Sequence, residues 1–401
     1  MLTGKHILLG ITGGIAAYKT ANLASMLVKL HAEVHVIMTK NAQQIISPVV
    51  FEALTGNKVV DDVFDRDSGY HVAHIAMAQE ADIVMIAPAS ANMIAKLANG
   101  IADDMLSTTM LATQAPVYVV PAMNTHMLEH PATQANIQRL REHGYRIVEP
   151  ASGFLACGDN GKGKMPEAEV LLEYLLLEAA CEKDLAGKKV LVTAGPTREA
   201  IDPVRFLSNH STGKMGYALA KNAARRGAEV VLVSGPVQLA APLAVQMVPV
   251  TTAQEMYEAV TAHLDGQDMI VMSAAVADYR PLHPADEKMK KKDGAAVLEL
   301  ERTKDILGSL SARRGSQFLC GFSMETEHML ENSRAKLEKK KLDLIVANNL
   351  KMDGAGFGTD TNIITLITKN TVQELPKMSK DEAAHAIFDQ ILRQIKEEKG
   401  S

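Results

Sequence analysis

One cysteine lies apart from the others, in a stretch rich in glycine and lysine. Cys157 belongs to ASGFLACGDNGKGKM, at residues 151–165, while Cys181 and Cys320 are far away in the sequence. Because no C-x-x-C pair is present, the spacing favours neither a disulfide framework nor a zinc site, and it is typical of a reducing compartment. An unpaired thiol, with an ordinary pKa of about 8.5, can donate a proton near neutral pH. The glycine spacing is that of a phosphate loop, but Met165 occupies the position where Ser or Thr is required for Mg²⁺.

Small and amide side chains that could bind a ligand follow three apolar runs in the first half of the chain. The runs have the length and the Val/Ile content of strands buried on both faces, and their carboxyl ends would meet at the edge where open α/β sheets bind ligands. There Ser90 could donate to a phosphate or simply start a helix, Asn92 could cap a helix, and Asn124 could bind a carboxylate without adding charge. The segments are GITGGIAAYK (10–19), APASANMIAKLANG (87–100) and PAMNTHM (121–127).

The ends of the first two apolar runs narrow the class of ligand. The glycines do not form a full G-x-G-x-x-G, and the second run ends in Thr39-Lys40 where a dinucleotide site has an acidic residue for the ribose. The sequence therefore favours a mononucleotide over NAD. His74 lies in a helical pattern before the third run, where a single histidine is ordinarily a surface or core residue. His71 is three residues away, but no Asp, Glu or Cys cluster completes a metal site.

Strand-like runs alternate with helical patterns along the whole chain, which predicts two α/β domains with parallel sheets. The rhythm stops near residues 180–188 and restarts, so we divide the chain into residues 1–187 and 188–401. The predicted strands cover residues 6–10, 33–39, 82–88, 116–122, 145–150, 188–195, 229–235, 245–250, 268–275, 318–322, 343–349 and 362–368. Residues 281–296 lack periodicity and are expected to form a mobile basic loop.

Basic side chains gather in the second half. Lys288 lies in EKMKKK, and Lys336 and Lys340 are four residues apart on one face of a predicted helix. Such runs are ordinarily solvated faces, and the alternative is a clamp for a polyanion. STGKMG (211–216) imitates a phosphate loop, but the pattern G-x-x-x-x-G-K-[ST] is absent.

The composition is ordinary for a globular protein, with 401 residues, 47% hydrophobic, 22% charged and a net charge of −5. No global positive field would attract nucleic acid or anionic membrane, and the absence of tryptophan argues against a base-stacking surface. No apolar run approaches the roughly 20 residues of a membrane span. We expect a cytoplasmic protein with small-molecule partners.

The ligand-binding segments of the first half, taken with the cysteine stretch, resemble the flavin-dependent cysteine decarboxylases of coenzyme A synthesis. The resemblance implies that His74 is the base, that Asn124 holds the substrate carboxylate, and that Cys157 reprotonates an intermediate while residues 151–165 close as a lid. In this chemistry the substrate thiol is oxidised to a thioaldehyde that accepts the electrons released with CO2, and the resulting enethiol is then reduced. The implied FMN contacts are Gly13, Gly14, Thr39, Ser90, Ala91, Asn92, Met93 and Ala122.

The second half resembles the phosphopantothenate–cysteine ligases that are fused to this decarboxylase in bacteria. The shared motifs are SNHSTGKMG, AAVADYRP, EKMKKK, KDI and K-x-x-x-K-x-x-D-x-I-x-x-N, although Thr303-Lys304 replaces the usual Asn-Pro. The resemblance implies that CTP, with Mg²⁺, activates phosphopantothenate as an acyl-cytidylate before cysteine displaces CMP. Asn209 would support the first step and Lys288 the second. The implied CTP contacts are Met272, Ser273, Ala274, Asp278, Lys288, Lys304, Asp305, Ile306, Leu307, Phe322, Lys336 and Lys340.

Together the two resemblances predict a bifunctional enzyme with two doubly wound domains, a flavodoxin-like flavoprotein domain followed by a Rossmann-like ligase domain. They imply a homo-oligomer based on trimers, up to a dodecamer, and they assign no metal ligands. Two alternatives stay open. A flavoprotein reductase would leave Cys157, Asn124 and the second domain unexplained, and a flavin-binding regulatory subunit would be expected to lack the histidine or the cysteine.

Overall fold

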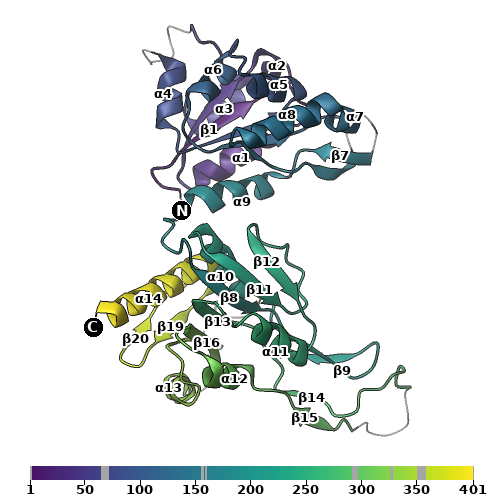
Figure 1. Ribbon diagram of the computed structural model, residues 1–401, viewed down its shortest axis with the longest axis vertical. Helices are drawn as coiled ribbons and strands as arrows, with labels where there is room; N and C mark the ends of the chain where they lie inside the picture. Colours follow the sequence, from purple (N-terminus) through teal and green to yellow (C-terminus); the bar gives the residue numbers. More distant parts are fainter. Residues whose placement is uncertain are drawn as a thin grey trace. The chain divides into compact units, whose positions relative to one another are not determined.

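Two compact units, Met1–Cys181 and Glu182–Ser401, make up the chain (Figure 1). The structure is a computed structural model that describes residues 2–64, 72–154, 158, 160–290, 297–325, 328–349 and 358–400. Each unit has its own sheet and its own hydrophobic core. Within these described ranges, no helix has both the length and the apolar character needed to cross a membrane.

The first unit contains a five-stranded sheet in which neighbouring strands are parallel. The strand order β2-β1-β3-β4-β5 is the flavodoxin-like order, and it reverses between β1 and β3. This confirms the predicted fold class. The strands are β1 (His6–Ile11), β2 (Glu33–Met38), β3 (Ile83–Ala89), β4 (Val117–Pro121) and β5 (Arg146–Ile147).

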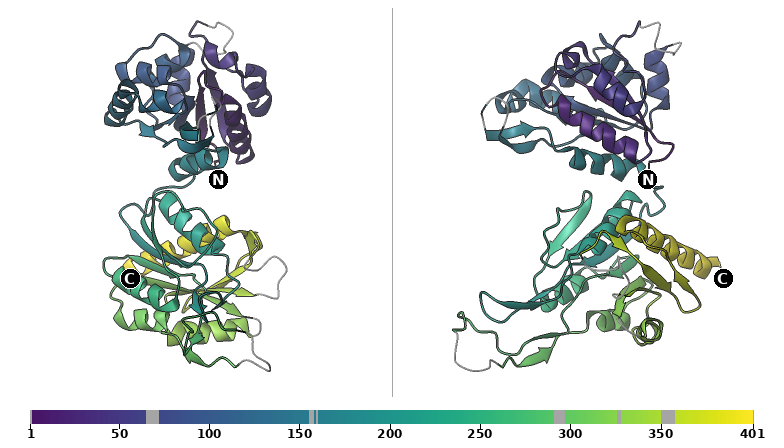
Figure 2. Two further views of the ribbon diagram at one scale, coloured as in Figure 1. Left: turned by 90° about the vertical axis from the view of Figure 1, so that its right-hand side faces the viewer. Right: turned by 180° about the vertical axis from the view of Figure 1, so that it is seen from behind.

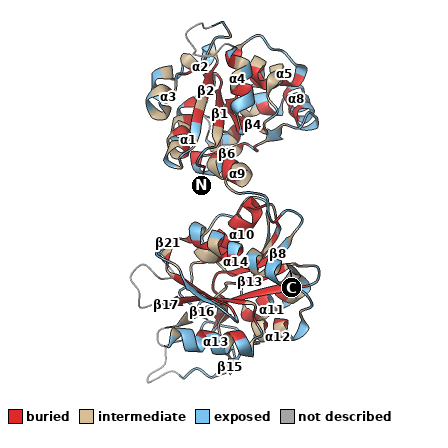
Figure 3. Cartoon of the chain, turned by 90° about the vertical axis from the view of Figure 1, so that its left-hand side faces the viewer, coloured by how far each residue is buried: buried red, intermediate tan, exposed pale blue. Residues whose placement is uncertain are grey.

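Helices cover both faces of this sheet, and the buried residues form two layers around it (Figures 1 and 3). Helices α1, α3 and α9 pack against one face, and α4, α5, α6 and α8 pack against the other. Consecutive residues of β1, such as Leu8 and Leu9, therefore enter opposite cores, which explains the continuous apolar run. The helices are α1 (Ala17–Lys29), α2 (Lys40–Gln43), α3 (Pro48–Thr55), α4 (Ala73–Glu80), α5 (Ala91–Asn99), α6 (Met105–Ala112), α7 (Thr125–Glu129), α8 (Pro131–Glu142) and α9 (Ala168–Ala179).

The second unit contains an eight-stranded sheet with the order β12-β11-β8-β13-β16-β17-β19-β20. The first six strands are parallel and follow the Rossmann order, which confirms the predicted Rossmann-like fold. Strands β19 and β20 are antiparallel additions at one edge. The strands are β8 (Lys189–Ala194), β11 (Glu229–Ser234), β12 (Val245–Pro249), β13 (Met269–Met272), β16 (Phe318–Glu325), β17 (Leu344–Asn349), β19 (Ile364–Ile367) and β20 (Val372–Glu374).

Helices also cover both faces of the second sheet (Figure 2). Helices α11, α12 and α13 share a core with one face through Met256, Leu310 and Leu337. Helix α10 packs on β8 and β11, and α14 packs on α10. The helices are α10 (Lys214–Arg225), α11 (Ala253–Ala262), α12 (Ile306–Arg313), α13 (Met329–Lys339) and α14 (Lys380–Gly400).

Short antiparallel strand pairs complete both units, and two of them lie at segments that the sequence singled out. Residues 151–154 and 160–164, on either side of Cys157, pair as antiparallel strands within the segment that was expected to close as a lid. Residues 279–281 pair with 300–302, so only Pro281 of the loop expected at 281–296 is a strand residue, and residues 282–290 form neither helix nor strand. The pairs are β6 (Ala151–Phe154) with β7 (Asn160–Lys164), β9 (Arg198–Ala200) with β10 (Phe206–Ser208), β14 (Tyr279–Pro281) with β15 (Leu300–Arg302), and β18 (Thr361–Asn362) with β21 (Met378–Ser379).

Candidate functional sites

The first candidate site is a cavity of about 470 Å³ at the carboxyl edge of the first sheet. Its walls come from the segments that follow β1, β2 and β3, and from α5 and α6. Gly14 and Ala122 do not line it, but a Cβ on Gly14 would lie 3.9 Å from Ala122 O. The other residues expected to contact FMN all line the cavity: Gly13, Thr39, Ser90, Ala91, Asn92 and Met93.

Two hydroxyl side chains start helices at this cavity. Ser90 Oγ accepts a hydrogen bond from Met93 N–H at 3.3 Å and caps α5, and Thr39 Oγ1 caps α2 in the same way. The cap of α5 is therefore Ser90, whereas Asn92, expected as the cap, lies in the first turn and lines the cavity. The positive end of the α5 dipole favours an anionic group of a ligand here.

The turn that follows β1 is packed closely against the segments that follow β2 and β3. A Cβ on Gly13 would lie 2.6 Å from Asn41 Cβ, so only glycine fits this turn. Thr12 Oγ1 donates to Pro88 O at 2.7 Å and accepts from Ser90 N–H at 2.9 Å, which ties the end of β1 to the end of β3. The fixed glycine turn and the helix N-terminus together fit a phosphate-bearing mononucleotide such as FMN.

An ion-pair cluster on the cavity wall was not predicted from the sequence. Lys96 Nζ lies 2.5 Å from Asp103 Oδ1 and 2.7 Å from Asp104 Oδ2. Burial would raise the pKa of Asp104, but hydrogen bonds from Lys96 and Ser107 outweigh it and lower that pKa below its ordinary value. Asp104 also caps α6, and Ser107 Oγ accepts a hydrogen bond from Asp104 N–H. The D-x-x-S spacing is the sequence signal that could have revealed this cap.

Two expected catalytic residues of the first unit do not line the cavity. His74 lies half-buried in the first turn of α4, and its Nδ1 is buried without a hydrogen-bond partner among the described residues. Asn124 caps α7, where its Oδ1 accepts from His126 N–H at 2.9 Å. Met127, on α7, does line the cavity.

The hairpin on either side of Cys157 is fixed to the segment that contains Asn124. Cys157 itself lies outside the described residues. Strands β6 and β7 are antiparallel, with Phe154 opposite Asn160. Met123 N–H donates to Gly163 O at 3.1 Å, and Thr125 Oγ1 donates to Lys162 O at 2.9 Å. The strand that follows Cys157 is therefore bonded to the residues on either side of Asn124.

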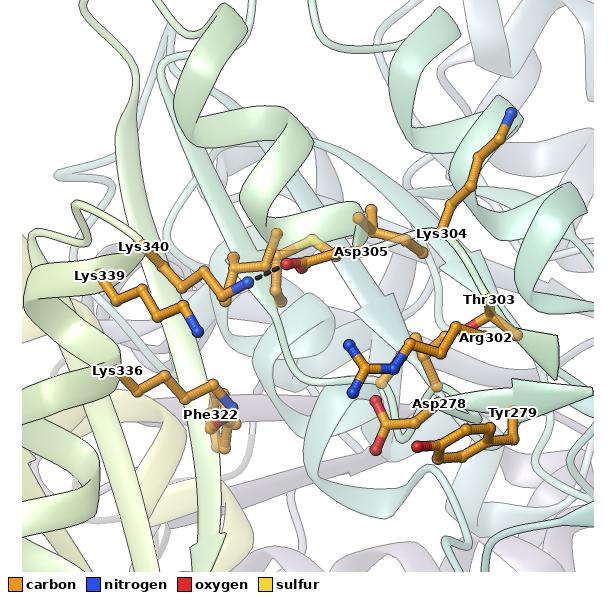
Figure 4. A pocket seen from close by; sticks show the side chains of 15 residues that line it. Asp278, Tyr279, Arg302, Thr303, Lys304, Asp305, Phe322, Lys336, Lys339 and Lys340 are labelled. Atoms are coloured by element: carbon orange, nitrogen blue, oxygen red, sulfur yellow. Dashed lines mark hydrogen bonds and ion pairs between the residues drawn. The ribbon is translucent and has the colours of Figure 1, made fainter.

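The second candidate site is a cavity of about 530 Å³ at the carboxyl edge of the second sheet (Figure 4). Five basic and two acidic side chains line it, so it carries the excess positive charge that suits a polyphosphate. Ser273 and Lys288, which were also expected at CTP, do not line it. The expected CTP contacts that do line it are Met272, Ala274, Asp278, Lys304, Asp305, Ile306, Leu307, Phe322, Lys336 and Lys340.

The expected lysines of this cavity are held in different ways. Lys336 Nζ donates to Phe322 O at 2.8 Å, and Lys340 forms an ion pair with Asp305, the N-cap of α12. Lys304 Nζ lies 4.6 Å from the centroid of the Tyr257 ring and points away from the other two lysines (Figure 4). The structure therefore brings Lys336 and Lys340 together, as their spacing predicted, but directs the ammonium of Lys304 elsewhere.

Arg302 and Lys339 also line the second cavity, and sequence analysis missed both. In the β14–β15 pair, Arg302 lies opposite Tyr279, while Arg280 lies opposite Glu301 and pairs with it at 2.8 Å. Since side chains alternate along a strand, Arg302 and Tyr279 share the cavity face and the ion pair lies on the other face. This alternation could be read from the sequence only if the pairing of β14 with β15 were known.

Asn209 and Lys288 do not line the cavity, and hydrogen bonds hold Asn209 itself and the residue after Lys288. Asn209 Nδ2 donates to Ala275 O at 2.9 Å, three residues after the end of β13. Lys288 precedes Met289, whose N–H donates to Asp202 Oδ2 at 3.1 Å. Across the described ranges, no group of three or more His, Cys, Asp or Glu side chains could hold a metal ion.

Comparison with known proteins gives matches along nearly the whole chain. Residues 1–178 match the family described as Flavoprotein, and residues 185–395 match the DNA/pantothenate metabolism flavoprotein C-terminal domain. The Coenzyme A biosynthesis bifunctional protein CoaBC of Bacillus subtilis (strain 168) is 49% identical over 395 residues, which cover 98% of this chain and 97% of that protein. The chain belongs to this family of bifunctional coenzyme A biosynthesis proteins.

Two solved structures resemble the two units. The C-terminal domain of a CoaBC protein is 44% identical, with a TM-score of 0.47, and the match covers 54% of this chain and all (100%) of that one. The FMN-dependent cysteine decarboxylase SpaF is 36% identical, with a TM-score of 0.40, and the match covers 45% of this chain and 100% of that one. The flavoprotein match spans the first cavity, and the C-terminal-domain match spans the second.

Proposed function

We propose that the chain carries out two consecutive reactions of coenzyme A biosynthesis. Residues 188–401 would join 4′-phosphopantothenate to cysteine at the expense of CTP, and residues 1–187 would decarboxylate the product to 4′-phosphopantetheine with FMN. Family membership over nearly the full length is the observation that carries the proposal. The positively charged second cavity and the glycine-turn cavity of the first unit supply matching chemistry.

In the ligase reaction, a carboxylate oxygen of phosphopantothenate attacks the α-phosphorus of CTP, and pyrophosphate leaves. The cysteine amine then attacks the acyl carbon, loses a proton, and displaces CMP. The leaving pyrophosphate develops negative charge, which Lys336, Lys340 and Arg302 would stabilise together with a nucleotide-bound Mg²⁺. Asn209 would support the first step and Lys288 the second. The hydrogen bond from Asn209 Nδ2 to Ala275 O fixes the position of the side-chain amide.

In the decarboxylase reaction, the first cavity would hold FMN through the glycine turn and the helix starts at Thr39 and Ser90. The chemistry that FMN supplies when bound is the uptake and return of two electrons. Asn124 would hold the substrate carboxylate, because an amide can bind it without the charge that would oppose loss of CO2. His74, with its unsatisfied Nδ1, would accept a proton, and Cys157 would deliver one.

We propose that copies of the chain assemble into a homo-oligomer that completes the flavin site, and that the enzyme is cytoplasmic, where free thiols persist. Within one chain, His74 and Asn124 are not among the residues that line the first cavity. Apolar side chains at its lining remain exposed, namely Phe64 and Met127. A second copy could cover these side chains and bring the remaining catalytic groups to the cavity.

One assay tests both activities. Purified protein is mixed with phosphopantothenate, cysteine, CTP and Mg²⁺, and CO2 and phosphopantetheine are followed by mass spectrometry. We expect both products, no cysteine consumption without CTP, and a slow ligase after chelation of Mg²⁺. A yellow, FMN-loaded protein that forms phosphopantothenoylcysteine without CO2 would refute the decarboxylase and favour a reductase or a regulatory subunit. An equal ligase rate with ATP would refute the choice of nucleotide.

Replacement of Cys157 tests the last step of the decarboxylase. Cys157→Ser is expected to release CO2 and stop at the enethiol, because a serine hydroxyl is too weak an acid to reprotonate it. Mass spectrometry distinguishes the enethiol from phosphopantetheine by two hydrogens. Complete product formation by this variant would rule out the acid role.

A further inference from the structure

A buried carboxylate in the second unit holds the backbone next to Lys288. Asp202 is 3% exposed and lies in the turn between β9 and β10. Its Oδ1 accepts hydrogen bonds from Val204 N–H at 2.9 Å and from Arg205 N–H at 2.8 Å, and these bonds shape the turn. Its Oδ2 reaches the neighbouring loop and accepts from Met289 N–H at 3.1 Å. One carboxylate thus joins two segments that are far apart in sequence.

Arg205 also contacts the backbone of Met289, through its carbonyl oxygen. Its Nε donates to Asp202 Oδ2 at 2.9 Å, and its Nη2 donates to the same oxygen and, at 3.0 Å, to Met289 O. A further tie runs from Ala285 N–H to Ile201 O at 2.9 Å. Both polar backbone groups of Met289 are therefore held by one ion pair, through charge-assisted bonds that are stronger than neutral ones.

We propose that Asp202 is a positioning residue of the ligase: through this clamp on Met289 it determines where the Lys288 side chain can reach. The inference rests on the role proposed for Lys288 in amide formation. Lysine has a long, flexible stem, so its backbone position sets the region that the ammonium can occupy. A displacement of about 1 Å can cost a reacting group roughly 100-fold in rate.

The clamp is charged under all ordinary conditions. The side-chain hydrogen bond from Arg205 lowers the pKa of Asp202 well below its usual range, and the backbone N–H donors of Val204, Arg205 and Met289 add to the effect. Asparagine has the same shape, and its oxygen can keep the turn. Its NH₂ group would then face Met289 N–H and the Arg205 guanidinium. Both are donors, and an NH₂ group cannot accept a hydrogen bond from either. Asp202→Asn therefore removes the clamp with little change to the turn.

The test is a single-turnover ligase assay with the full chain, in which the acyl-cytidylate and the amide are followed by mass spectrometry. For Asp202→Asn we expect acyl-cytidylate formation close to the parental rate and a loss of roughly 10- to 100-fold in its reaction with cysteine. The control Asp286→Asn removes the same charge from an exposed position of the same loop and should change neither step. Decarboxylation of supplied phosphopantothenoylcysteine by the first unit measures the amount of full chain, and parental acyl-cytidylate formation shows that the second unit is folded.

Comparison with Lys288→Gln decides the outcome. If Asp202 acts through Lys288, the double variant is no slower in amide formation than Lys288→Gln alone. Additive losses, or equal slowing of both steps by Asp202→Asn, would overturn the inference. If Lys288→Gln forms the amide at the parental rate, the role proposed for Lys288 is refuted and the inference falls with it. If Lys288→Gln forms the amide slowly and Asp202→Asn forms it at the parental rate, the inference is overturned and the role proposed for Lys288 stands.

A second variant guards against misfolding of Asp202→Asn. Met289→Pro removes the N–H that the carboxylate holds and leaves the Asp202–Arg205 pair intact, and it also fixes φ at residue 289 and restricts the backbone of Lys288. It is expected to slow amide formation by a similar factor while acyl-cytidylate still forms. Parental amide formation by Met289→Pro would contradict the clamp.

Discussion

Gly163 should be essential for the decarboxylase although it lies outside the first cavity. Its φ of +139° is disfavoured for residues with a side chain, and a Cβ there would lie 2.2 Å from Met123 O. In Gly163→Ala, backbone strain of about 1–3 kcal/mol adds to the loss of the Met123 N–H bond to Gly163 O, worth about 1 kcal/mol. The total of about 2–4 kcal/mol lowers the equilibrium constant for the attachment of β7 to residues 123–125 by roughly 30- to 700-fold.

The expected result is a large fall in the turnover of supplied phosphopantothenoylcysteine, because β7 leads directly from Cys157 and is bonded beside Asn124. FMN absorbance and the ligase rate should be unchanged, and exchange of the Met123 amide hydrogen should accelerate. Gly144→Ala is the matched control: its φ of +87° brings similar strain, but no atom lies within 4 Å of the added Cβ. Parental turnover by Gly163→Ala, or an equal loss in Gly144→Ala, would refute the reasoning.

Three further outcomes follow from the same geometry. Arg302→Ala should raise the KM for CTP about tenfold, the cost of one charge-assisted contact, whereas Arg280→Ala, on the opposite face of the same strand pair, should leave it unchanged. The folded-state pKa of Asp104 is lowered, so its pairing stabilises the first unit above its unfolded pKa of about 4 and is lost as the pH falls below that value. Urea unfolding followed by flavin fluorescence should therefore separate Asp104→Asn from the parent at pH 7 and show the two converging as the pH falls through the lowered folded-state pKa of Asp104. Asp305→Ala removes both the cap of α12 and the partner of a cavity lysine, and should destabilise the second unit by about 1 kcal/mol in urea unfolding.

The sheets were predictable from sequence because their strands are buried on both faces. A strand such as β3 is entirely buried, so its whole length must be apolar, and the run IVMIAPA marks it with few competing interpretations. The ligand edge followed from the same pattern, since parallel strands bring Gly13, Thr39 and Ser90 to one end of the sheet. Burial and apolar patterning along each strand were therefore enough to predict these elements.

The residues that were missed depend on contacts between distant segments. Arg302 faces the second cavity only because it pairs with Tyr279 across an intervening loop. The strands β19 and β20 have compositions like those of other short strands. Their composition therefore does not predict that they run antiparallel to their neighbours. Glycines in the cysteine stretch indicated flexibility, yet a Cβ on Gly161 would lie 2.4 Å from Thr125 Oγ1. Composition alone does not distinguish a glycine required for close packing from one that permits motion.

In both units, the residues proposed to bind ligands and the residues proposed to act in a later step belong to different segments, and the sequence does not indicate this separation. At each sheet edge, residues proposed to bind ligands are fixed as helix caps, as Ser90 is on α5 and Asp305 is on α12. The groups proposed to act later, Cys157 and Lys288, belong to segments that hydrogen bonds join to neighbouring segments, and Gly163 and Met289 take part in these bonds. A change at either of these two contacts should leave ligand binding intact and slow only the later step. Binding and the later chemistry would then be separable by mutation in both units, at residues that touch no ligand.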